Sequence, residues 1–182
     1  MNKNKKLLTL GILLLISGII AALISSEPSG ILQYTFAGTT FTAGVLGVLI
    51  GREKKGGFVR SAYYSWIGFI MIGLSISLGI WATSVIAFIN VLGFFLLILG
   101  IVEFVFVLQI LSYETIIPWK ILGLKLSLAA LTATGATWIM TTAGYNVYSA
   151  LLFLGVLFIL AGSSFIKVGR LSKDAELSEV IQ

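Results

Sequence analysis

The chain has 182 residues, is 58% hydrophobic and 10% charged, and has a net charge of +5 and a mean hydropathy of +1.08. Because soluble domains carry about 25% charged residues, this composition excludes a soluble enzyme or binding domain and predicts a membrane protein. Cysteine and histidine are both absent, which removes thiolate chemistry, disulfides and the usual zinc and haem ligands, so no metal or cofactor is expected.

Six apolar segments follow one another along the chain, and each is long enough to cross a hydrocarbon core of about 30 Å. Backbone groups in lipid must be satisfied within each segment, so the segments are predicted to be helices. The first follows a basic N-terminus that resembles a signal peptide, but we expect it to be retained as a span. The predicted spans are Leu7–Ile24, Ile31–Ile50, Ser61–Trp81, Val85–Leu111, Trp119–Met140 and Val147–Val168.

Basic residues predict the orientation of these spans. With six crossings, all 12 Lys and Arg residues fall on one side, and the connections 25–30, 82–84 and 142–146 contain none. The positive-inside rule then places both termini in the cytoplasm. The net positive charge therefore reflects topology, and no nucleic-acid partner is expected. We expect a transmembrane domain over residues 1–169 and a cytoplasmic tail over 170–182.

Glycines recur at a spacing of 55 to 57 residues, close to the length of a helical hairpin. Such a period predicts an all-α membrane protein built from three helical-hairpin repeats, at about 7–51, 61–111 and 119–168. Glycines seven residues apart within a helix lie on one face and favour close helix packing, with a gating hinge as the alternative. The periodic set is Gly11, Gly68 and Gly123 in odd helices, and Gly44, Gly100 and Gly155 in even helices.

One carboxylate, Glu103, interrupts the apolar run 98-ILGIVEFVFVLQI-110. Folding the chain back between the fourth and fifth spans places Glu103 and Lys125 at similar depth, about 10 Å inside the cytoplasmic boundary. We predict that they form an intramembrane polar pair, because unpaired charges in a span are costly. The alternatives are a snorkelling Lys125 beside a protonated or hydrated Glu103, a proton-responsive switch, and contact with a substrate or ion.

Two further polar residues, Asn90 and Gln109, lie within the fourth span. A hydrogen bond from Asn90 to a neighbouring helix is expected in preference to a role in a pore. The loop 52-REKKGGFVR-60 carries Arg52, Lys54, Lys55 and Arg60. These residues are expected to determine topology, and anionic lipid contact is the alternative.

The sequence carries no nucleotide-binding loop, metalloprotease motif or nucleophile elbow. A serine or threonine nucleophile would need Lys125 as its base, which the predicted pairing with Glu103 opposes. We therefore expect a non-enzymatic protein with no catalytic residues.

The segments 97-LILGIVEFVFVLQI-110, 11-GILLLISGII-20 and 151-LLFLGVLFILAGSSFIKVGR-170 resemble the HdeD family of small acid-resistance membrane proteins. Gly100, Ile101 and Glu103 match the even-helix pattern of that family, and SSEPSG, with Pro28, is similar to its outer turns. The resemblance implies six helices in three repeats and a link to acid or envelope stress in a prokaryotic inner membrane.

The sequence thus favours a non-enzymatic, multi-pass inner-membrane protein that acts by packing, lipid contact or partner binding, as a homo-oligomer or with another membrane protein. One alternative is a small transporter or channel in which Glu103 faces a central path. The other is an accessory subunit of a larger membrane complex.

Overall fold

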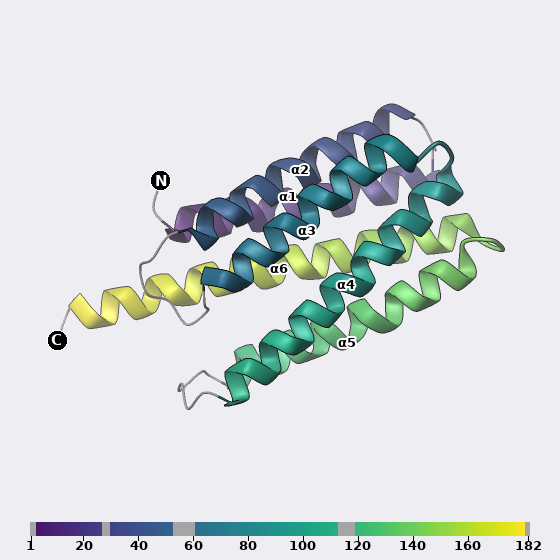
Figure 1. Ribbon diagram of the computed structural model, residues 1–182. Coiled ribbons are helices and arrows are strands. Elements are labelled where there is room, and N and C mark those ends of the chain that lie inside the picture. The colour runs from purple at the N-terminus through teal and green to yellow at the C-terminus, as the bar shows by residue number, and fades with distance from the viewer. Residues whose placement is uncertain (1–2, 27–29, 53–60, 113–118, 181–182) are drawn as a thin grey trace.

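The computed structural model describes residues 3–26, 30–52, 61–112 and 119–180. These residues form six helices that lie roughly side by side in one bundle (Figure 1), and all six are long and apolar enough to cross a membrane. The bounds are α1 Lys3–Ser26, α2 Gly30–Gly51, α3 Ser61–Trp81, α4 Val85–Ser112, α5 Trp119–Thr142 and α6 Val147–Val180. The described chain therefore has the architecture of a multi-pass membrane protein.

The sixth helix is longer than the apolar segment from which it was predicted. Helix α6 continues to Val180, whereas the hydropathy signal ends near Val168. No glycine or proline follows Gly169, so nothing in the sequence breaks the helix where the apolar residues stop. We expected the transmembrane domain to end at residue 169 and a tail to begin at residue 170. The composition changes there, but the helix continues.

Short connections join the helices at the end of the bundle opposite to the beginning of α1 (Figure 1). Ser84 precedes α4, and its Oγ accepts a hydrogen bond from the backbone N of Ala87 at 3.2 Å. Asn146 precedes α6, and its Oδ1 accepts from the backbone N of Ser149 at 3.0 Å. Both are N-caps, which satisfy backbone donors that a helix leaves free in its first turn.

The helices pack in a closed order in which each contacts the next and α6 returns to α1. The most extensive contacts join α1 to α6, α2 to α3, and α4 to α5. The N-terminal and C-terminal helices are therefore neighbours in the bundle. Buried apolar side chains from all six helices, including Leu14, Phe36, Leu74 and Phe88, form the core between them.

Glycines permit the closest of these contacts. A Cβ on Gly18 of α1 would lie 2.7 Å from the carbonyl oxygen of Gly155 in α6, and one on Gly11 would lie 2.7 Å from that of Gly162. Real side chains do not come so close, so these two backbones can approach only because both helices carry glycine at the contact. Between α2 and α3, a Cβ on Gly44 would lie 2.9 Å from the Gly68 carbonyl.

Of the six periodic glycines, Gly123 differs from the rest, because nothing lies within 4 Å of the place where its Cβ would be. Gly100 does lie at a contact, since its Cβ would be 2.9 Å from the backbone N of Ala133 in α5. The glycine period therefore coincides with helix packing at five positions and not at the sixth.

Large apolar side chains also cover the outside of the bundle, among them Ile19, Phe69, Phe94 and Leu160. Exposed threonines on the same surface donate their hydroxyls to their own helix, as Thr134 does to the Ala130 carbonyl at 2.7 Å. Such bonds satisfy a hydroxyl without water. This surface is suited to a lipid environment.

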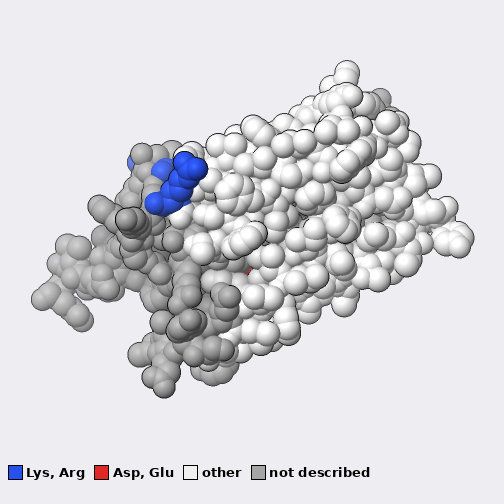
Figure 2. Space-filling model, viewed as in Figure 1, with Lys and Arg blue, Asp and Glu red and all other residues white. Residues whose placement is uncertain are grey.

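Among the described residues, exposed basic side chains gather at one end of the bundle. On the face seen in Figure 2, described basic side chains lie at the end where α1 begins, and elsewhere only a trace of an acidic group is visible, in a recess. Lys5, Arg52, Lys167 and Arg170 are all exposed. Of the four basic loop residues, Lys54, Lys55 and Arg60 lie outside the described residues.

Candidate functional site: a buried polar cluster

Three polar side chains from three helices meet inside the bundle. Tyr63 lies in the first turn of α3, Glu103 in the C-terminal half of α4, and Lys125 in the second turn of α5. Their exposed fractions are 4%, 5% and 3%, respectively. We refer to Tyr63, Glu103 and Lys125 as the polar cluster.

The members of the polar cluster are bonded to one another. Lys125 Nζ lies 3.1 Å from Glu103 Oε1, as an ion pair, and donates a hydrogen bond of 2.7 Å to the Tyr63 hydroxyl. The Tyr63 hydroxyl in turn donates to the same Glu103 oxygen. The two residues that sequence depth placed together are thus in contact, and Tyr63 bridges them.

Aromatic rings surround the ammonium group. Lys125 Nζ lies 4.9 Å from the centroid of the Tyr63 ring and 4.7 Å from that of Phe165 in α6. The Tyr63 ring also stacks on Phe106 of α4, with centroids 4.0 Å apart. Because ring faces carry negative potential, this arrangement favours the cation at a buried position. The polar cluster therefore ties α3, α4 and α5 together and is closed off by α6.

One atom of the polar cluster is left without a partner. Glu103 Oε2 is buried and makes no hydrogen bond to any described residue. Ser164 Oγ is also buried and likewise makes no hydrogen bond to a described residue. A buried acceptor without a bond costs about 1–3 kcal/mol. Glu103 Oε1 accepts two bonds while Oε2 accepts none, so half of the carboxylate remains available.

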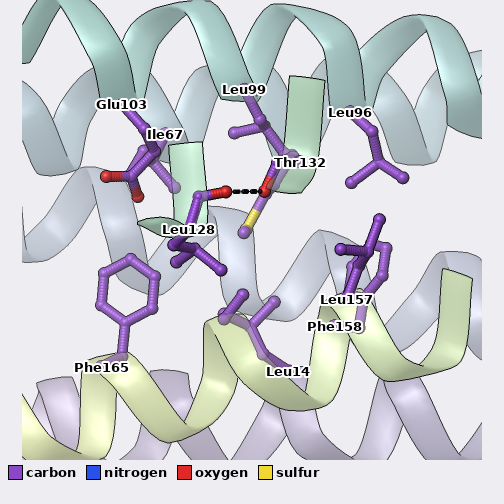
Figure 3. Close-up of a pocket in the computed structure, with 12 residues that line it drawn as sticks. Leu14, Ile67, Leu96, Leu99, Glu103, Leu128, Thr132, Leu157, Phe158 and Phe165 are labelled. Atoms are coloured by element: carbon purple, nitrogen blue, oxygen red, sulfur yellow. Dashed lines mark hydrogen bonds between the residues drawn. The ribbon is translucent and has the colours of Figure 1, made fainter. Parts of the chain in front are cut away.

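Glu103 borders a cavity of about 40 Å³ at the centre of the bundle. The other lining residues come from α1, α3, α4, α5 and α6, and all except Ala161 are buried. Figure 3 shows Glu103 and Phe165 toward one end of this space and Leu96 toward the other. Thr132 lines it from α5, and its hydroxyl donates to the Leu128 carbonyl at 2.7 Å.

The other polar residues of the fourth span are not part of this site. The side chain of Asn90 is exposed on the outside of the bundle and does not line the central cavity. The side chain of Gln109 lies outside what the structure describes. Among helix-to-helix polar contacts, Ser75 Oγ in α3 donates to the Ala37 carbonyl in α2 at 2.8 Å.

Sequence reasoning did not find Tyr63 or Thr132. The pair Tyr63–Tyr64 begins a span, where tyrosine ordinarily marks the membrane interface, so its position gave no indication that the ring turns inward. Thr132 follows Lys125 by seven residues, which places both on one face of α5. That spacing could have predicted that Thr132 faces the same side of the helix as Lys125.

Comparison of the chain with family models, with curated proteins and with solved structures found no match. The helices and the polar cluster themselves indicate the class of protein. It is an α-helical multi-pass membrane protein with ionisable groups inside its bundle.

Proposed function

We propose that this chain is a non-enzymatic inner-membrane protein of the HdeD type, associated with acid or envelope stress. The observation that carries the non-enzymatic part is the bonding within the polar cluster. Lys125 donates to Glu103 and Tyr63, and the Tyr63 proton is directed to Glu103. The Lys125 amine is thus bonded to two partners and is not the free base that a serine or threonine nucleophile in this chain would need.

In this proposal the polar cluster stabilises one arrangement of α3, α4 and α5. Ion pairs inside a membrane domain cost desolvation energy, and their best-attested use is to specify one packing over others. The protein then acts through its surface, by contact with lipid, with a second copy or with another membrane protein. Arg52, exposed at the end of α2, is the described member of the basic loop that would contact anionic lipid.

We further propose three hairpin repeats with both termini in the cytoplasm. The pattern of contacts supports the repeats, because it recurs every two helices. Each time, the second helix of one hairpin packs most extensively on the first helix of the next, as α2 does on α3, α4 on α5 and α6 on α1. The gathering of exposed Lys5, Arg52, Lys167 and Arg170 toward the end where α1 begins supports the orientation.

Growth of a deletion strain at low and at neutral pH tests the stress role. We expect a defect at low pH alone, restored by the wild-type gene. Equal growth of the deletion and parent strains under acid and envelope stress would contradict the proposal.

The central cavity supports a second candidate, a small transporter or channel, because Glu103 borders a space shared by five helices. Liposomes containing the purified protein distinguish the two. The non-enzymatic proposal expects no protein-dependent flux of protons or small solutes. Flux that disappears in Glu103→Gln would favour transport instead.

A further inference from the structure

We propose that the central cavity is an internal water-binding site, in which water hydrogen-bonds to Glu103 Oε2 and to Thr132 Oγ1. Two observations point to a ligand here. The first is the cavity itself. The second is Glu103 Oε2, on a side chain that is 7% exposed, which bonds to no described residue. The site is independent of the stress role proposed above.

The size of the cavity selects the ligand. A cavity needs about 10–15 Å³ of this kind of space to hold one water, whereas an aromatic ring occupies a cavity of about 150 Å³. The space beside Glu103 measures about 40 Å³. By this measure it accommodates about three or four water molecules at most, and it excludes a ring or a lipid chain.

Charge and ligand number exclude a metal ion. Glu103 is already paired with Lys125 at 3.1 Å, so a second cation would leave a net positive charge among apolar walls. Two lining residues, Glu103 and Thr132, offer side-chain oxygens, and the rest are apolar. Calcium requires six or more oxygen ligands, and magnesium requires a near-ideal octahedral set.

Water matches the hydrogen-bonding groups that remain. Thr132 uses its proton on the Leu128 carbonyl, so its oxygen can only accept, and Glu103 Oε2 is also an acceptor. Each water molecule supplies two donors, and a buried water needs two to four polar partners. In a pair of waters, the first donates to Glu103 Oε2 and to the second water, and the second donates to Thr132 Oγ1. Both protein acceptors are then satisfied, and each water has two polar partners.

Hydroxyl-radical footprinting of the full-length protein in nanodiscs, carried out in H₂¹⁸O, tests this site. Radicals formed from bound water label the side chains that touch it. Phe165 lines the cavity and Phe88 does not, although both are buried. We expect several-fold faster ¹⁸O labelling of Phe165 than of Phe88, and equally slow labelling of the two rings would overturn the proposal.

Matched threonine variants test the second anchor. Thr132 and Thr40 are both buried, and each donates its hydroxyl to the carbonyl four residues earlier, but only Thr132 lines the cavity. We expect Thr132→Val to lower labelling of Phe165 severalfold and Thr40→Val to leave it unchanged. Labelling that responds to neither variant would show that Thr132 does not hold the water.

The double variant Glu103→Leu/Lys125→Met tests the first anchor without leaving a lone charge. We expect Phe165 labelling to fall to the level of Phe88. Labelling that persists at the wild-type rate would contradict hydration through Glu103.

Discussion

Removal of one charge from the polar cluster is predicted to cost more than removal of both. The Glu103 and Lys125 side chains are 7% and 3% exposed, so either residue alone would be a buried charge without its counterion. Breaking such a pair by deleting one partner costs about 3–5 kcal/mol, whereas replacing both by apolar groups of similar volume is often neutral. The relevant variants are Glu103→Leu, Lys125→Met and their combination.

The surroundings predict which single variant is worse. In Glu103→Leu the ammonium keeps two aromatic rings within 5 Å, and a desolvated cation–π contact contributes about 2 kcal/mol. The loss should therefore be near 3 kcal/mol. In Lys125→Met the carboxylate keeps only the Tyr63 hydroxyl among the cluster donors, so the loss should be near 5 kcal/mol.

The double variant leaves the Tyr63 hydroxyl without its two partners, which costs about 1–3 kcal/mol. Adding Tyr63→Phe removes that group, so the triple variant should lie within about 1 kcal/mol of wild type. The free energy of unfolding is measured by SDS titration in mixed micelles, followed by helical circular dichroism. Leu126→Met, an exposed change beside Lys125, is the control. Additive losses in the double variant would refute the coupling.

The same unfolding assay checks three further predictions, on five variants. Gly18→Ala should cost about 1–3 kcal/mol, because the new Cβ would meet the Gly155 carbonyl. Gly38→Ala, which has open space around it, should be neutral or stabilising. Equal effects of the two variants would refute glycine-dependent packing. Ser75→Ala should cost about 0.6 kcal/mol, because it removes the hydrogen bond to the Ala37 carbonyl. Ser127 bonds only within its own helix, so Ser127→Ala should cost less. The reverse order would argue against the bond between Ser75 and Ala37. Asn90→Leu should not destabilise the protein, since Asn90 is exposed, and a loss above about 1 kcal/mol would reveal a bonded partner.

The helices and their order could be predicted from the sequence because a membrane requires long, continuous apolar segments. The approach of Glu103 to Lys125 also followed from depth, since one short connection joins their helices and fixes their relative height. Tyr63 is 40 residues from Glu103, and no local spacing relates its helix to the other two. Its place in the cluster depends on how three helices rotate against one another.

The position of Asn90 shows why rotation is hard to predict here. Helix α4 is apolar on all sides, so its sequence does not mark the face that turns inward. In a soluble bundle, polar residues would indicate the outer face. In lipid the outer face is apolar too, and only the glycine contacts and the buried charges distinguish the two sides.

The central claim is that six spans place the two ends of the bundle on opposite sides of the membrane. Cysteine accessibility tests this claim most directly. The sequence contains no cysteine, so single substitutions at exposed Arg52 and Tyr145 give unambiguous labelling by a membrane-impermeant maleimide. We expect Tyr145→Cys to react in intact cells and Arg52→Cys only after permeabilisation. Reaction of both positions from the same side would contradict the six crossings, and with them a polar cluster inside the membrane.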